Sequence, residues 1–266
     1  MKVWLVHVPF NADTLTDQLY EAALLCIDER SRARVRRFYH GEDRWRCLIG
    51  RVLPRVLLTD RGILSNDIQI GSTASGKPFI ESPVLDPPLS FNVTHDSGCV
   101  AMAFDDGAQD EKIGMDLMRV HIPPGETVTS FVGIMSDQLT QRERLHLASL
   151  RDPSGAAEGL FKYWTLKEAY TKALGFGLGL DFSRIEYNVD HTGIVDGGDV
   201  LVDGAPLSGW EFHGFHFTKG PDRYLGMVAK STSQSGVKVS WTDLSGCDWA
   251  EEVSALDILG RAIPFA

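Results

Sequence analysis

The chain has 266 residues, of which 43% are hydrophobic, and it carries a net charge of −10. This length fits one large domain or two small ones, and the apolar content suffices for a packed core, which excludes a largely disordered chain. The acidic balance argues against nucleic-acid binding by the whole surface. No apolar run reaches the length of a membrane span, and the N-terminus lacks a signal-peptide cleavage pattern. We therefore expect a soluble, cytoplasmic protein with neither a nucleic-acid nor a membrane partner.

The four cysteines, Cys26, Cys47, Cys99 and Cys247, lie far apart and form no CxxC pair. This spacing indicates neither a zinc site nor a disulfide framework. A reducing compartment and cysteines within the core are the simpler interpretation.

The first half begins with alternating apolar residues over 3–8, which predict a strand, followed by a helix over 14–27. A second helical run is predicted over 43–58, interrupted at Pro54. Apolar residues alternate on both sides of the turn sequence Asp-Ser-Gly at 96–98, so we expect a β-hairpin over 89–104.

The second half begins with an alternating strand over 113–120. Helices are expected over 136–150 and 158–174, and another hairpin over 210–230. Residues 231–266 have the pattern of a tail with one short helix near 250–259.

The two predicted hairpins share the same order of alternating residues, polar turn, and small apolar residues. This similarity indicates two similarly built halves that meet near residue 110. Together with the mixture of strands and helices, it predicts an α+β fold.

One segment departs from the acidic character of the chain. Nine arginines lie between residues 30 and 55, against only Glu42 and Asp43: Arg30, Arg32, Arg34, Arg36, Arg37, Arg44, Arg46, Arg51 and Arg55. For any single arginine a solvated helix face is the default interpretation, but nine in one segment favour an anion-binding site.

The helix over 158–174 is amphipathic, with Glu168 and Lys172 at the edge of its apolar arc. An exposed Glu–Lys pair at this spacing stabilises a helix by only a few tenths of a kcal/mol, roughly. Lys167 falls inside the apolar arc, so it either reaches the surface with its long chain or meets a buried anion. The glycines that follow end the helix, and they are not a phosphate-binding loop because they do not follow a strand.

The strand over 113–120 places Asp116 on the same face as Gly114 and Met118. A carboxylate at a strand end is a candidate ligand for a hard cation if a second carboxylate comes from elsewhere. A lone aspartate there is more often a surface or turn residue.

Three segments, FNVTHDSG (91–98), IGMDLM (113–118) and WTLKEAYTKALGFGL (164–178), occur in this order. They resemble the three signature segments of the surfactin-type 4'-phosphopantetheinyl transferases. The basic stretch RRFYHGEDRWRCLIGRVLPR and the tripeptide GKP at 76–78 are also similar to family segments, so the resemblance covers residues 1–230.

The resemblance implies Mg²⁺-dependent transfer of the phosphopantetheine arm of coenzyme A to a serine of an acyl or peptidyl carrier protein, with release of adenosine 3',5'-bisphosphate. It also implies two similar α/β two-layer subdomains, residues 1–110 and 111–230, related by a pseudo-twofold with the active site between them. Residues 231–266 would form a C-terminal extension. A single chain holding both halves implies a monomer.

Residue roles follow from the same resemblance. Asp116 and Glu168 match metal ligands, and Glu168 also matches a proposed general base. His95 and Lys172 match catalytic residues of the family, which contact the phosphates of coenzyme A. The residues that match coenzyme A contacts are Arg34, Arg46, Lys77, Thr94, His95, Lys167 and Lys172. Arg36, Arg37 and Arg44 are expected to be structural or to face the carrier protein.

Met118 departs from the family pattern, because bacterial members usually have a second acid at this position. A thioether is a poor ligand for a hard cation, so we expect water in its place and expect Met118→Glu to be tolerated. The alternative is a family member that binds coenzyme A or a carrier protein without transferring anything. Residues 130–135 are either a carrier-docking surface or a buried element. The sequence does not distinguish fatty-acid, polyketide, non-ribosomal peptide and lysine-pathway carriers.

Overall fold

The computed structural model describes residues 1–11, 13–107, 111–188 and 200–265. The chain divides into two compact units, Met1–Gln109 with Asp248–Ala266, and Asp110–Cys247. The boundary near residue 110 therefore agrees with the one expected from the sequence, although part of the connecting polar turn lies outside the described residues. No helix in the described part of the chain is long and apolar enough to cross a membrane.

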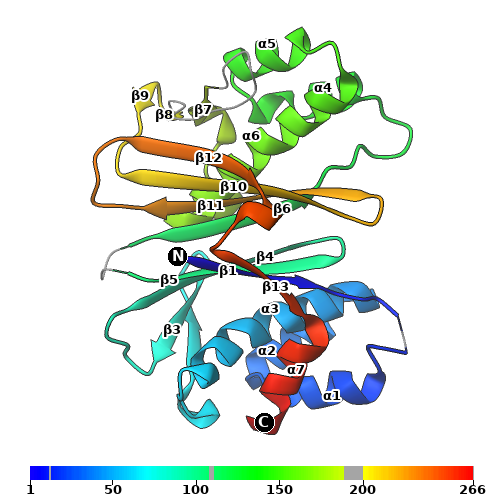
Figure 1. Cartoon of the computed structure of the whole chain (residues 1–266), viewed down its shortest axis with the longest axis vertical. Helices are drawn as coiled ribbons and strands as arrows, with labels where there is room; N and C mark the ends of the chain where they lie inside the picture. The colour runs from blue at the N-terminus through cyan, green and yellow to red at the C-terminus, as the bar shows by residue number, and fades with distance from the viewer. Residues whose placement is uncertain (12, 108–110, 189–199, 266) are drawn as a thin grey trace. The chain divides into compact units, whose positions relative to one another are not determined.

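The first unit is built on a four-stranded sheet with the order β13-β1-β5-β4. Its strands are β1 (Lys2–His7), β4 (Leu89–Asp96), β5 (Cys99–Asp106) and β13 (Ala250–Ser254). Four helices, α1 (Asp17–Leu25), α2 (Glu29–Arg36), α3 (Gly41–Asp60) and α7 (Ala255–Ala262), and the hairpin of β2 (Gln69–Ser72) and β3 (Pro78–Ser82) complete the unit (Figure 1). Short 3₁₀ turns lie at Ser65–Asp67 and Ile263–Phe265.

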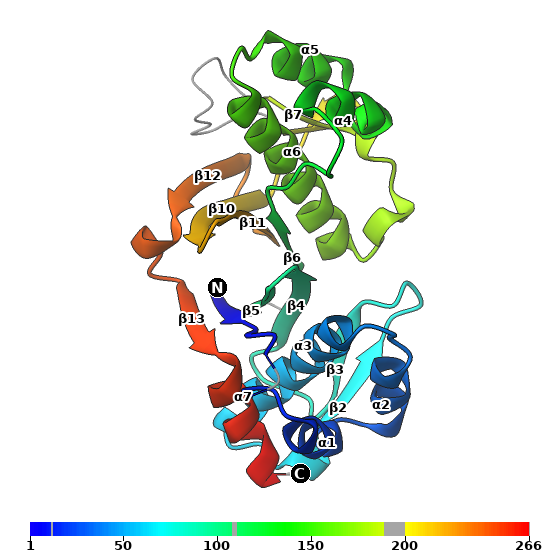
Figure 2. The ribbon, with the colours of Figure 1, turned by 90° about the vertical axis from the view of Figure 1, so that its right-hand side faces the viewer.

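The second unit is built on another four-stranded sheet, with the order β12-β10-β11-β6. Its strands are β6 (Ile113–Arg119), β10 (Trp210–Lys219), β11 (Asp222–Ser231) and β12 (Val237–Asp243). The helices are α4 (Val128–Ile134), α5 (Gln141–Ser149) and α6 (Pro153–Leu174), and the strands β7 (Ile185–Tyr187), β8 (Val200–Val202) and β9 (Ala205–Pro206) form a small separate sheet. Figure 2 shows α6 running along the sheet of this unit.

Both units contain the same β–helix–β–β repeat. In the first unit β1, α3, β4 and β5 occur in this order, with other elements between them, and β5 lies between β1 and β4 with antiparallel pairing on both sides. In the second unit β6, α6, β10 and β11 repeat this order, with β11 antiparallel to both β6 and β10. The α+β fold with two similar halves is confirmed by this repeat.

The helix α3 continues through Pro54, so the interruption expected there is wrong. A proline inside a helix removes one backbone hydrogen bond. Its neighbours Leu53 and Val56 are buried in the core of the first unit, and their packing holds the helix together despite that loss.

The interpretation of residues 231–266 as a single tail is also wrong, because the structure divides them between the two units. Strand β12 pairs in parallel with β10, whereas β13 pairs in parallel with β1. After β13, the apolar face of α7 enters the core of the first unit through Ile258 and Leu259, both fully buried. The sequence pattern missed these strands because their pairing partners lie far away in the chain.

Candidate functional site

A cluster of two carboxylates and one ammonium lies in the second unit. Asp116 comes from β6, and Glu168 and Lys172 come from α6. The Nζ atom of Lys172 lies 2.7 Å from Oδ1 of Asp116 and 3.6 Å from Oε1 of Glu168. The structure thus brings together three residues that the sequence singled out on separate elements.

The position of this cluster depends on Gly114, two residues before Asp116. A Cβ atom at Gly114 would overlap the backbone of α6, since it would meet the carbonyl oxygen of Ala169 and the amide nitrogen of Ala173, and would lie 2.8 Å from Cα of Ala173. Only a glycine lets strand and helix approach so closely. Alternation along β6 then turns Asp116 toward the same helix.

Within the cluster, the carboxylate of Glu168 is influenced by burial and by two nearby charges. Burial raises the pKa of Glu168, the negative charge of Asp116 raises it further, and Lys172 opposes both effects. The Oε2 atom of Glu168 is buried and accepts no hydrogen bond from the described residues.

The cluster fits a magnesium ion by its chemistry. Mg²⁺ is usually held by one or two carboxylates together with water and substrate phosphates. Within the described residues no group of three or more His, Cys, Asp or Glu side chains could hold a metal. Asp116 and Glu168 are the two carboxylates that the cluster would offer to such an ion.

Lys167 has a different environment from the one that the resemblance implies. Its side chain is 1% exposed, and its Nζ atom lies 2.5 Å from Oε2 of Glu143 and donates to the carbonyl oxygen of Gln138 at 2.9 Å. Its ammonium is therefore paired inside the second unit, and its contact with coenzyme A stays a prediction. The buried anion that explains a lysine in the apolar arc is Glu143.

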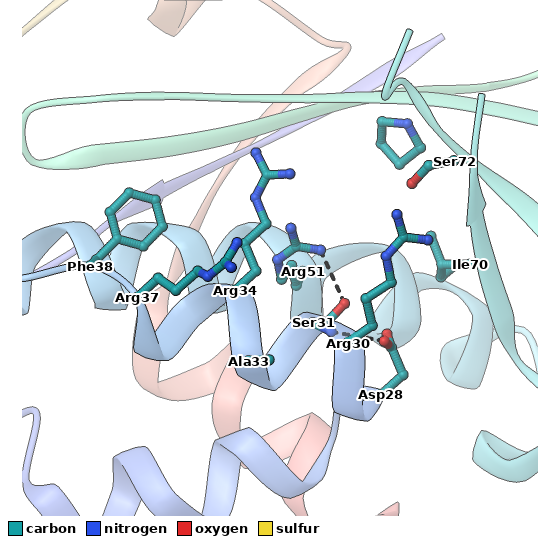
Figure 3. A pocket seen from close by; sticks show the side chains of 11 residues that line it. Asp28, Arg30, Ser31, Ala33, Arg34, Arg37, Phe38, Arg51, Ile70 and Ser72 are labelled. Carbon is teal, nitrogen blue, oxygen red and sulfur yellow. Dashed lines mark hydrogen bonds between the residues drawn. The ribbon is translucent and has the colours of Figure 1, made fainter. Parts of the chain in front are cut away.

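A basic pocket of about 610 Å³ lies in the first unit (Figure 3). Arg30 and Arg34 of α2 and Arg37, the residue that caps this helix, extend into it. Arg51 of α3 also lines it, and its Nη1 atom donates to Oγ of Ser31 at 3.0 Å. The opposite wall is formed by Ile70, Ser72 and Pro78 of the β2–β3 hairpin.

An adjoining pocket of about 230 Å³ shares Arg34 and Arg51 with the first. It continues past Cys47 and Gly50 of α3 to His95 at the end of β4, and Arg46 also lines it. Together the two pockets form one basic groove, which we call the arginine groove.

Arg46 is held in place by several partners. It donates to Oδ1 of Asp43 at 2.5 Å and to the carbonyl oxygen of Ser97, and its guanidinium lies 5.4 Å from the ring centre of Phe10. The hydrogen bond from Arg46 lowers the pKa of Asp43. Arg46 therefore presents a fixed, partly neutralised guanidinium to the groove.

The other predicted contacts lie near the groove with different exposure. Lys77 is half-buried in the turn between β2 and β3, and its neighbours Gly76 and Pro78 line the groove. Thr94 is buried in β4, where alternation turns its side chain to the face opposite His95.

The sequence placed Arg30, Arg37 and Arg51 in an anion-binding segment, but it gave Arg30 and Arg51 no individual role and expected Arg37 to be structural or to face the carrier protein. Arg30, Arg34 and Arg37 are spaced i, i+4, i+7, so they share one face of α2, and this spacing was the available signal. By contrast Arg36 pairs with Glu21 at 3.3 Å, and Arg32 donates to the carbonyl oxygen of Ile27 at 2.9 Å.

Residues 130–135 belong mainly to α4 and include both packed and exposed side chains. The ring of Phe131 stacks on Phe161 with centres 6.3 Å apart, whereas Ile134 is 61% exposed. One side of this short helix thus packs against the core of the second unit, and the other presents an apolar side chain to the surface.

Comparison with known proteins shows the family of the chain. The family description "4'-phosphopantetheinyl transferase, N-terminal" matches residues 14–106, and "4'-phosphopantetheinyl transferase superfamily" matches residues 112–226. The chain is 41% identical over 253 residues to 4'-phosphopantetheinyl transferase pptA of Paxillus involutus, covering 92% of each chain. It is 29% identical over 182 residues to 4'-phosphopantetheinyl transferase Sfp of Bacillus subtilis, covering 68% of this chain and 75% of the relative.

One solved structure also aligns with the chain, a holo-(acyl-carrier-protein) synthase from Bacillus anthracis in complex with coenzyme A. The alignment covers 46% of this chain and 96% of that chain, with 22% identity and a TM-score of 0.33.

A carboxylate–ammonium cluster and a basic groove are features that suit a protein that binds a substrate with several phosphates. The chain belongs to the 4'-phosphopantetheinyl transferase superfamily. It is an enzyme of the class that transfers the phosphopantetheine arm of coenzyme A to carrier proteins.

Proposed function

We propose that this enzyme uses Mg²⁺ and transfers the 4'-phosphopantetheine arm to a serine hydroxyl of acyl and peptidyl carrier proteins, releasing adenosine 3',5'-bisphosphate. The cluster of Asp116, Glu168 and Lys172 carries the proposal, because it combines two carboxylates with an ammonium group that reaches both of them. Such a cluster suits a metal-bound diphosphate, whose charge needs neutralisation from several sides.

Within this cluster we assign Asp116 and Glu168 as the residues that would hold Mg²⁺. When bound, the ion would neutralise the charge that develops on the diphosphate. Lys172 would then turn its ammonium toward the same diphosphate. Oε2 of Glu168, which is buried and accepts no hydrogen bond from the described residues, is suited to accept the proton of the carrier serine.

We assign the arginine groove to the nucleotide end of coenzyme A. Coenzyme A has a 3'-phosphate and a diphosphate, and guanidinium groups bind phosphates with paired hydrogen bonds. Arg30, Arg34 and Arg37 would surround the 3'-phosphate, and His95 would contact the diphosphate at the other end of the groove. A total volume of several hundred Å³ is typical of sites for ligands of this size.

For the carrier protein we propose an acidic partner with an apolar helix. The exposed side chains of Tyr39 and Arg36, which flank the groove residues Arg37 and Phe38 in the sequence, offer basic and apolar contacts for it. Since one chain carries both the groove and the cluster, we propose that the enzyme acts as a monomer.

The test is the intact mass of an apo carrier protein after incubation with the enzyme, coenzyme A and Mg²⁺. We expect one added phosphopantetheinyl group per carrier, lost with a chelator and slowed by about 10³-fold in Asp116→Asn and Glu168→Gln. Glu158→Gln is the matched control, because Glu158 lies on the same helix but pairs at the surface with Lys162 and Arg223.

Full transfer by Asp116→Asn in the presence of chelator would contradict the assignment of the metal site. Binding of coenzyme A without transfer to any of several carriers would instead indicate a member that binds its ligand without catalysis, with Met118 as the first residue to examine.

A further inference from the structure

The helix α6 carries a buried ion pair that the assigned chemistry does not use. Glu143 is 0% and Lys167 1% exposed, and Nζ of Lys167 lies 2.5 Å from Oε2 of Glu143. Lys167 directly precedes Glu168 in the helix.

The carboxylate of Glu143 joins four segments of the second unit. Its Oε2 atom accepts from the amide of Thr140 at 2.9 Å, and its Oε1 atom accepts from the amide of Tyr187 at 3.0 Å. Lys167 adds the carbonyl oxygen of Gln138 at 2.9 Å. The start of α5, the turn before it, strand β7 and helix α6 therefore meet at one ion pair.

The pair and Gly114 hold α6 on two different faces. With about 100° per residue, and Lys167 taken as the origin, Ala169 and Ala173 lie near 200° and 240°, where the helix backbone contacts Gly114. Glu168 and Lys172 lie near 100° and 140°, between the two fixed faces. A rotation of α6 about its axis would have to break one of these two attachments.

We propose that the Glu143–Lys167 pair is a positioning device, which sets the rotation of α6 and thereby directs Glu168 and Lys172 toward Asp116. This inference rests on the metal-binding role proposed for Glu168. A buried ion pair is weak support for stability, because apolar residues of similar volume often replace it without loss. The pair instead fixes an orientation, because its four hydrogen bonds have defined directions, whereas an apolar contact has none.

The experiment compares the double variant Glu143→Leu/Lys167→Met with the wild type and with Lys162→Met. The double variant removes both charges together and leaves neither unpaired. Lys162→Met removes a surface lysine of the same helix that pairs with Glu158 at 2.9 Å. Binding of Mn²⁺ is measured by electron paramagnetic resonance on the whole enzyme without substrate, and kcat and KM for coenzyme A are measured separately.

We expect the double variant to unfold cooperatively, with Mn²⁺ affinity reduced about tenfold and a lower kcat. Lys162→Met should match the wild type in Mn²⁺ affinity, kcat and KM for coenzyme A. A folded double variant with wild-type Mn²⁺ affinity and kcat overturns the proposal.

If the double variant does not fold, Glu143→Gln decides the question, because it keeps the shape of the side chain and removes its charge. Reduced Mn²⁺ affinity in the folded variant supports the positioning role, and unchanged affinity overturns it. Glu168→Gln is measured in parallel: if it leaves Mn²⁺ affinity unchanged, the proposed metal site fails, whatever the pair does.

Discussion

Gly114 of β6 and Ala169 of α6 touch through their backbones, because a Cβ atom at position 114 would overlap the carbonyl oxygen of Ala169. This contact sets the distance between the strand that carries Asp116 and the helix that carries Glu168 and Lys172. The cluster therefore requires Gly114 as well as its three charged residues.

Gly114→Ala should therefore destabilise the protein by about 2–3 kcal/mol, since strand and helix must separate to admit a methyl group. The free energy of unfolding in urea measures this. Gly260→Ala is the matched control, because Gly260 lies within α7 and its added methyl group would meet no atom within 4 Å. There the higher helix propensity of alanine should raise stability by up to about 1 kcal/mol. If both substitutions changed the free energy of unfolding by the same amount, the contact between Gly114 and α6 would not be a tight one.

Arg34→Ala and Arg37→Ala should each raise the KM for coenzyme A by about tenfold, as expected from the loss of a charge-assisted hydrogen bond of about 1.4 kcal/mol. Arg36→Ala should change this KM by less than about twofold, because Arg36 pairs with Glu21 and does not line the arginine groove. Initial rates at varied coenzyme A and fixed carrier concentration separate these cases. If all three substitutions raise the KM for coenzyme A by the same factor, the cause is the net charge of the protein and not the arginine groove.

The C-terminal helix should be essential for the first unit. Ile258→Ala should cost about 2–4 kcal/mol, because Ile258 is 0% exposed in the core of that unit. Leu256→Ala, at a position 46% exposed in the same helix, should cost well under about 1 kcal/mol. Thermal and urea unfolding of both variants test this. Similar small losses would mean that α7 is only loosely attached.

Stability should fall on mild acidification in part through His146. Burial lowers the pKa of His146 below its ordinary value of 6.5, so the folded state binds this proton more weakly than the unfolded state. Above about pH 6.5 both states are neutral at this residue, and as the pH falls below that value the unfolded state gains a proton and becomes favoured.

The variant His146→Gln can still hydrogen-bond the hydroxyl of Tyr163. Its free energy of unfolding should fall less steeply between about pH 6.5 and 5, because the slope against pH then lacks the fraction of a proton that His146 contributes. His213, whose pKa burial also lowers, keeps part of the dependence in this variant. An unchanged slope would show that His146 titrates alike in both states.

Local patterns were sufficient for much of the molecule. The repeat of 3.6 residues in α6 predicted that Glu168 and Lys172 share a helix edge, and alternation in β6 predicted the face of Asp116, because both depend only on near neighbours in the chain. The two hairpins, with their polar turns, likewise pointed to two similar halves, which the repeated order β1-α3-β4-β5 and β6-α6-β10-β11 confirms.

By itself, the sequence determined most helices and hairpins of the two units, since local periodicity encodes them, and its resemblance to a known family pointed to Asp116, Glu168 and Lys172. Tertiary structure alone decided that Lys167 meets Glu143, 24 residues away, and that β13 pairs with β1 at the other end of the chain. It also decided which arginines face the groove, because the β2–β3 hairpin forms the opposite wall. These contacts join segments distant in sequence, where burial and charge pairing, and not local conformational preference, select the partner.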